Sequence, residues 1–207
     1  RGEHGALPAG VAGRGAMNTG RWLPLVDRFV AEAFADDDSG LNLRHLRRTL
    51  HWLLELDPGA DEALQIAALA HDLQRAFRDD EPAPRDGFLD PVFLDHHQQR
   101  GGVIVADFLR REGADAALAE RVRTLISRHE EGGTDEQNLL RDADSVSFFE
   151  NNCDYFLRVL AAKEGPAAVR AKFAWMYKRI GSEPARRIAR PWCEAALARL
   201  NGLETNR

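Results

Sequence analysis

The stretch LQIAALAHDLQRAF, Leu64 to Phe77, decides the fold of this chain. Its first half is apolar on nearly every side of an α-helix, which is typical of a central helix that packs against several others. The apolar run ends in His71 and Asp72, two side chains that ligate metal ions well. We therefore predict a central helix from about Asp61 to Phe77, whose buried His-Asp pair needs compensation for its lost hydration.

The rest of the chain also shows helical patterns, with apolar residues at helical spacing and no alternating strand pattern or internal repeat. Thr134 with Gln137 has the form of a capping box, and Ser182 has the form of an N-cap ahead of Pro184. Three prolines and five acidic residues between 78 and 91 indicate a surface loop or lid. The fold class is therefore all-α, with further helices expected at about residues 21–34, 41–56, 91–111, 114–130, 135–162, 167–180 and 184–200.

Length and composition fit one globular domain, since the chain has 207 residues of which 44% are hydrophobic and 29% charged. We expect residues 17–207 to form this domain and the Gly/Ala-rich residues 1–16 to be an appended or upstream remnant. The net charge of −5 gives no reason to expect binding to nucleic acid or to an anionic membrane. Two cysteines are too few for a disulfide framework, and no apolar run reaches the length of a membrane span, so we expect a cytoplasmic protein.

The histidines follow the apolar faces of the predicted helices. One histidine from each of four helices is in phase with apolar residues, whereas His51 and His96 lie on other faces. A single inward histidine is more often a hydrogen-bonded core residue than a ligand. Four of them beside Asp72 would need many separate hydrogen-bond partners, and one metal centre satisfies them together. The four inward histidines are His45, His71, His97 and His129.

The order of these residues resembles the HD-domain superfamily, whose motif is H…HD…D on an all-α core. His45, the His71-Asp72 pair and an aspartate in LLRDADSV follow that order, over about Leu41 to Asp144. The segments HQQRGGVIVADFLRREG and VRTLISRHE resemble the extra histidine segments of the dinuclear subgroups. The resemblance implies an HD-type helical bundle, to which residues of about 163–207 add a C-terminal helical extension.

The last motif aspartate is either Asp142 or Asp144. Helical phase leaves both open, because each aligns with apolar positions. The family's AD pattern after a short apolar stretch favours Asp144. No GYP sequence follows, which argues against the cyclic-dinucleotide phosphodiesterase subgroup.

The resemblance implies a phosphohydrolase in which a metal-bound water attacks a small phosphorylated substrate such as a nucleotide. It implies one or two divalent ions, chosen from Fe, Mn, Co, Ni, Zn or Mg. One ion would be held by His45, His71, Asp72 and Asp144, and a second by His97 and His129, with Asp72 as the bridging carboxylate.

Other residues are candidates for substrate binding or proton transfer. Arg75 stands where many family members carry the lysine of HDxxK and is the first choice for a phosphate contact, although a solvated helix-end arginine is an equal alternative. Lys178 or Arg179, in a basic C-terminal stretch, would bind phosphate if the terminal helices fold over the metal cleft. Glu130, next to His129, is a candidate general acid or base or a surface residue.

Two other function classes fit the same sequence. Certain dinuclear HD proteins use the same four histidines and two aspartates to hold a diiron pair that cleaves bonds with O₂, so an oxygenase is the first alternative. The second is a regulatory module that binds metal or nucleotide without turnover.

Overall fold

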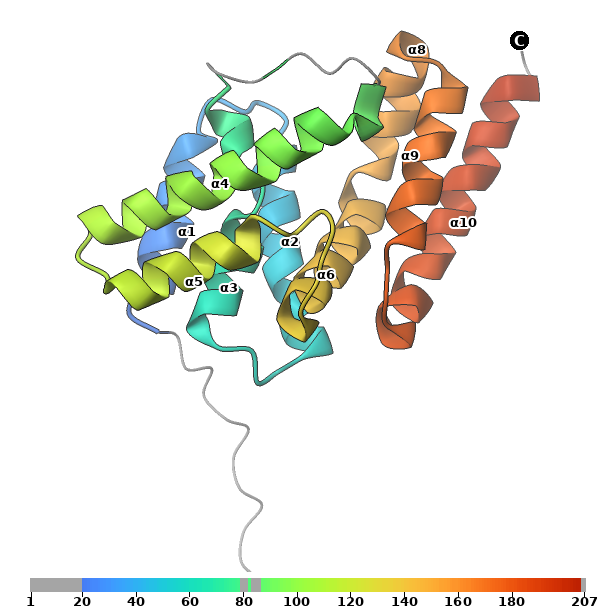
Figure 1. The fold of residues 1–207 in the computed structure, drawn as a ribbon. Coiled ribbons are helices and arrows are strands. Elements are labelled where there is room, and N and C mark those ends of the chain that lie inside the picture. Colours follow the sequence, from blue (N-terminus) through green and yellow to red (C-terminus); the bar gives the residue numbers. More distant parts are fainter. Residues whose placement is uncertain (1–19, 79–81, 83–86, 206–207) are drawn as a thin grey trace, which may run out of the picture.

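The computed structural model describes residues 20–78, 82 and 87–205, so the expectation about residues 1–16 lies outside the described part of the chain. Within these residues all regular structure is helical, which confirms the all-α prediction (Figure 1). The elements are α1 (Leu23–Ala33), α2 (Leu41–Leu56), α3 (Glu62–Ala70), the 3₁₀ turns η1 (Leu73–Ala76) and η2 (Gly87–Leu89), α4 (Pro91–Arg111), α5 (Ala116–Ile126), α6 (Asp135–Asn151), α7 (Cys153–Tyr155), the π-helical segment η3 (Phe156–Leu160), α8 (Ala161–Lys163), α9 (Pro166–Lys178) and α10 (Glu183–Thr205).

The helices form two groups that share α6. Figure 1 shows α4 and α5 side by side on one flank, α8 to α10 on the other, and α2 and α6 between them. One hydrophobic cluster joins α1 to α5 and reaches Leu140 and Ala143 of α6. A second cluster begins at Val146 and continues through α9 and α10. Asp144 therefore lies at the boundary between the two clusters.

A polar link fixes α2 against α6. Glu150 accepts two hydrogen bonds from Arg48, both of 2.8 Å, and a third of 2.8 Å from the indole of Trp52. Trp52 also packs against both hydrophobic clusters. This link joins the helix that carries His45 to the helix that carries Asp144.

Two adjacent glycines allow α4 to approach its neighbours closely. A Cβ atom at Gly101 would lie 3.0 Å from the carbonyl oxygen of His71, and one at Gly102 would lie 2.8 Å from the carbonyl oxygen of Arg123. A larger residue at either position would separate α4 from α3 or α5. The GG pair thus brings His97, one turn earlier on α4, next to the end of α3.

The predicted helix starts are confirmed, but three predicted helices end earlier than expected. The Thr134–Gln137 capping box is present, and Ser182 accepts a hydrogen bond from the amide of Ala185 at 3.4 Å. The central helix ends at Ala70 and not at Phe77, since Asp72 leaves the α conformation and a 3₁₀ turn follows. The helices expected at 114–130 and 135–162 end at Ile126 and Asn151. Among the described residues, no helix combines the length and apolar composition needed to cross a membrane.

Candidate metal centre

The four inward histidines meet at the end of α3. His45 and His97 lie inside α2 and α4, whereas His71 caps α3 and His129 follows α5 in a turn, so two of the four are not on helices as expected. All four are at most 4% exposed. In both places the α-helix ends before the histidine, at Ala70 for α3 and at Ile126 for α5.

Each of these histidines has its Nδ1 atom engaged by the protein. Nδ1 of His71 lies 3.0 Å from the carbonyl oxygen of Ala68, and that of His129 lies 2.8 Å from the carbonyl oxygen of Ile126. For His97 the partner is Oε1 of Gln74 at 2.8 Å. For His45 the partner is the Ser147 hydroxyl at 2.9 Å, which itself lies 2.8 Å from the carbonyl oxygen of His45. Carbonyl oxygens accept from Nδ1–H, so these contacts favour the tautomer whose Nε2 lone pair is free.

The four Nε2 atoms converge on the carboxylate of Asp72. They lie 2.7 Å (His97), 3.7 Å (His129), 3.9 Å (His71) and 4.0 Å (His45) from its nearer oxygen. The ligand atoms form two groups, each within 4.8 Å, made of His45, His71 and Asp72 and of Asp72, His97 and His129. Asp72 belongs to both groups.

The donor set fits a divalent cation. Nε2 of His71 is buried and makes no hydrogen bond to any described residue, although Asp144 Oδ1 lies 3.4 Å away. Burial alone lowers the pKa of His71, but the carboxylates of Asp72 and Asp144 outweigh it and raise this pKa to about 9. Desolvation also opposes ionisation of Asp72, yet Arg75 and the nearby histidines hold its pKa well below the usual range. A pocket that stabilises positive charge beside carboxylates and an imidazole nitrogen without a hydrogen-bond partner is suited to a metal ion.

The structure separates Asp144 from Asp142. Asp144 Oδ1 lies 3.1 Å from Nε2 of His45, so this carboxylate belongs to the cluster. Asp142 instead accepts hydrogen bonds from the amides of Gly181 and Ser182 at 2.7 and 2.8 Å. Its role is to hold the turn between α9 and α10.

Arg179 and Glu130 form a buried ion network beside the cluster. The guanidinium of Arg179 donates to Asp144 Oδ2, to Glu130 Oε2 and, at 2.9 Å, to the Ser145 hydroxyl. Although burial opposes ionisation of Glu130, the charge of Arg179 lowers its pKa to about 2. Glu130 is 6% exposed and therefore not a surface residue.

A cavity of about 550 Å³ opens from this network. Arg75 lines it, with its Nε donating to Asp72 Oδ2 at 2.6 Å, so this arginine is not merely a solvated helix end. Lys178 does not line it and is exposed, which corrects its selection as a phosphate ligand. The reason is that Lys178 lies about 100° round α9 from Arg179, on the outer face of the helix.

Three residues that sequence reasoning missed support the site. Gln74 and Ser147 hold the histidine rings, and Lys172 lines the cavity two turns before Arg179. Gln74 and Ser147 each follow a motif residue, His71 or Asp144, by three positions, and this helical spacing was a usable signal. Lys172 had a weaker signal, because it shares a helix face with Arg179 but lies in a stretch rich in exposed basic residues.

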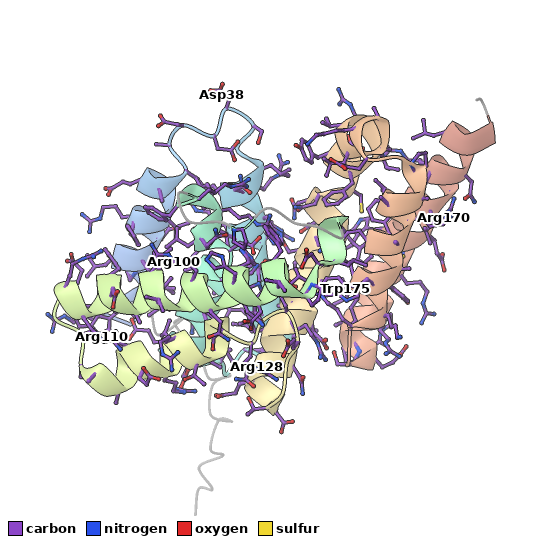
Figure 2. All side chains as sticks on the ribbon, turned by 45° about the horizontal axis from the view of Figure 1, so that its top comes forward. Asp38, Arg100, Arg110, Arg128, Arg170 and Trp175 are labelled. Atoms are coloured by element: carbon purple, nitrogen blue, oxygen red, sulfur yellow. The ribbon has the colours of Figure 1, made fainter. Side chains whose placement is uncertain are left out.

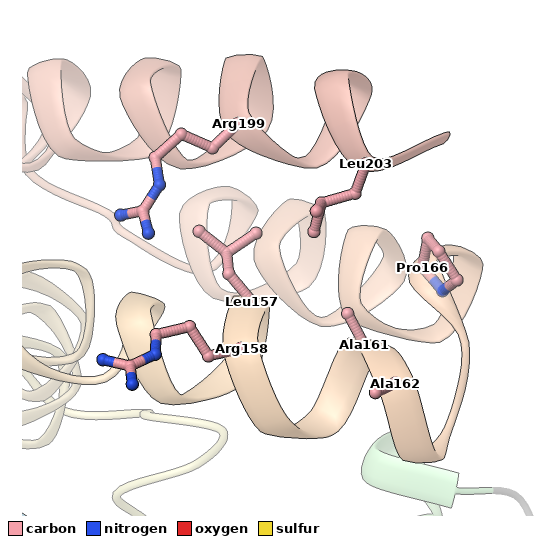
Figure 3. Close-up of a pocket in the computed structure, with 7 residues that line it drawn as sticks. All are labelled: Leu157, Arg158, Ala161, Ala162, Pro166, Arg199 and Leu203. Carbon is pink, nitrogen blue, oxygen red and sulfur yellow. The ribbon is translucent and has the colours of Figure 1, made fainter. Parts of the chain in front are cut away.

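A second cavity lies between the η3–α8 segment and α10 (Figure 3). Figure 3 shows Leu157, Ala161 and Leu203 beside the arginines Arg158 and Arg199. None of its described lining residues is a histidine, cysteine or carboxylate, so it offers no metal ligands.

Comparison with known proteins agrees with this architecture. The chain resembles the crystal structure of a predicted HD superfamily hydrolase from an uncultured Thermotogales bacterium, with a TM-score of 0.54, 20% identity, and coverage of 89% of this chain and 92% of that one. No curated protein matches the chain. The profile of a family described as a domain of unknown function, DUF4202, matches residues 31–186. The chain thus has the HD-type helical fold that its motif order predicted, and it belongs to the DUF4202 family.

Proposed function

We propose that this protein is a metal-dependent phosphohydrolase that acts on a nucleotide or another small phosphoester. One observation carries the proposal: four histidines, each held through Nδ1, direct Nε2 toward Asp72 beside a cavity lined with cations. The similar solved structure is that of a predicted HD superfamily hydrolase, which supports the same class of reaction.

In this proposal His45, His71, Asp72 and Asp144 hold one divalent ion, and His97 and His129 share Asp72 with a second. An ion bound there would supply Lewis acidity and would lower the pKa of water toward neutrality. The two ligand groups that share Asp72 support its assignment as the bridging carboxylate.

Glu130 is suited to orient water, and not to act as a general acid. Arg179 binds its Oε2 and keeps the carboxylate ionised, while its Oε1 lies 3.7 Å from Nε2 of His129. An ionised carboxylate is a hydrogen-bond acceptor only. We therefore assign Glu130 to hold the attacking water by accepting its hydrogen bond.

Arg75 has a double task in this proposal. Its Nε–H fixes Asp72, and the residue lines the cavity, where a phosphoryl group needs charge-assisted hydrogen bonds. The side chain is 33% exposed and so accessible to substrate. The apolar lining residues Phe148, Phe156, Leu160 and Met176 provide a surface for the organic part of a small molecule.

The test is the metal content of the purified protein, together with hydrolysis of a panel of nucleotides and phosphoesters under added Mn²⁺, Mg²⁺, Co²⁺ and Fe²⁺. We expect phosphate release that requires metal and disappears with chelator. His45→Ala should abolish it, whereas His51→Ala, on the same helix but outside the cluster, should retain it. Oxygen uptake by iron-loaded protein without phosphate release would indicate an oxygenase, and metal binding without either reaction would indicate a regulatory module.

A further inference from the structure

Helix α9 presents two cations to the cavity. Lys172 and Arg179 are seven residues apart, which places them on the same helix face about two turns apart. Lys172 is 9% exposed, and the side chain of Arg179 is 6% exposed. Trp175, labelled in Figure 2, lies between them, with Lys172 Nζ 4.4 Å and Arg179 Cζ 4.7 Å from its ring centroid.

The two cations differ in their partners. Arg179 is neutralised by Glu130 and Asp144. Lys172 makes no hydrogen bond and no ion pair to any residue that the structure describes, and its ammonium group lies over the Trp175 ring. Burial of an ammonium group without an anion costs free energy, so another interaction must offset the burial of Lys172.

The residues around Lys172 offset this cost only in part. Burial lowers the pKa of Lys172 to about 8, against the influence of Glu130, which favours the charged form. Glu130 is already bound by Arg179, so its charge is shared. An anion from outside the protein, bound in the cavity, would complete the coordination of the ammonium group.

We propose that Lys172 binds the phosphoryl group of the substrate, together with Arg75. This inference rests on the proposed function, because the same cavity must hold the phosphoester. Lys172 and Arg75 come from the two groups of helices, so a phosphate between them would join α9 to the end of α3. Arg179 then has the separate task of fixing Glu130 and Asp144.

The experiment measures binding of inorganic phosphate to the Mn²⁺-loaded protein by titration calorimetry, in the wild type and three variants. Lys172→Met, which keeps the length of the side chain and removes its charge, should weaken phosphate binding roughly tenfold to a hundredfold, as expected for a lost charge-assisted hydrogen bond. Lys172→Arg should bind within a few-fold of the wild type. Lys178→Met, on the outer face of the same helix, is the matched control and should not change the affinity.

Stability and kinetics provide independent readouts. Because Met removes a buried charge without a protein partner, Lys172→Met should unfold at a temperature no lower than the wild type. With a phosphoester that the wild type hydrolyses, the variant should raise KM more than it lowers kcat.

The outcomes separate this inference from the proposed function. Unchanged phosphate affinity in Lys172→Met, or no phosphate binding by the metal-loaded wild type, would overturn the role of Lys172 even if hydrolysis occurs. Loss of phosphate binding in Lys172→Met, in a wild type that hydrolyses no phosphoester, would uphold Lys172 as an anion ligand while the proposed reaction fails.

Discussion

The two groups of helices contribute different kinds of side chain to one site. The N-terminal group and α6 provide the four histidines, Asp72, Glu130 and Asp144, whereas α9 provides Lys172 and Arg179. The first set is suited to hold metal and the second to neutralise anions. The histidines and aspartates can be found from the order of a sequence motif. Lys172 can be found only from the packing of α9 against the other helices, although it lies beside the same network.

The largest expected effect is that of Asp72→Ala, which tests whether the N-terminal group alone holds the metal. Its carboxylate lies within 4.0 Å of all four Nε2 atoms, so its loss should remove both ions. We expect phosphoester hydrolysis to fall roughly a thousandfold or more, since metal provides several kcal/mol of transition-state stabilisation. The stabilisation of the fold by added metal should also vanish in thermal unfolding. Asp95→Ala, an exposed position on α4, is the control, and full metal content in Asp72→Ala would refute the site.

A second test compares neighbouring histidines on α4. His97→Ala should lower the metal content from two equivalents to one, because His97 belongs to only one of the two ligand groups. His96→Ala should leave it at two, since His96 belongs to neither group. Elemental analysis after dialysis measures both. A wild type that never binds more than one equivalent would reduce the proposal to a mononuclear site.

A third test compares Asp142 and Asp144, which lie two residues apart on α6 at the boundary between the two groups of helices. Asp144→Asn should weaken metal binding at least tenfold, because it replaces a proposed carboxylate ligand of one ion with a neutral amide. Asp142→Asn should leave metal affinity unchanged but lower the free energy of unfolding by about 2–4 kcal/mol, because it weakens two partly buried hydrogen bonds to the α9–α10 turn. Calorimetric metal titration and denaturant unfolding distinguish the two, and the reverse pattern would exchange their roles.

The last test is a pH dependence of metal affinity, which needs no substitution. In the metal-free protein the carboxylates of Asp72 and Asp144 outweigh burial and raise the pKa of His71 to about 9 from the ordinary value of 6.5. Metal must displace this proton, so the apparent affinity should fall by up to about tenfold for each pH unit below 9. The same shift stabilises the metal-free fold fully below pH 6.5, and this contribution is lost as the pH rises through 9. Titration calorimetry and unfolding curves between pH 6 and 9.5 should show both trends, and a flat profile would contradict the charged state of His71.

The boundaries of several elements could not be predicted from the sequence. The apolar pattern of residues 61–77 continues past Ala70, yet the backbone tightens into a 3₁₀ turn there, and this change directs His71 and Asp72 into one site. His129 likewise lies outside α5. The chain turns after Ser127, and the amide of Glu130 donates a hydrogen bond to Gln98 of α4. Both departures depend on contacts with other helices, which local periodicity does not encode.

The sequence by itself determined the all-α class, the main helix starts and the order of histidines and aspartates, because hydrophobic period and capping are local properties. Only the tertiary structure placed Asp144 beside His45 and Asp142 at the α9–α10 turn, since both fit the helical phase of α6 and their partners are far along the chain. It also placed Lys172 and not Lys178 in the cavity, because the packing of α9 selects which face of a helix with several basic residues is buried. A charged residue's surroundings are set by the helices that cover it, and these are fixed only when the two hydrophobic clusters assemble.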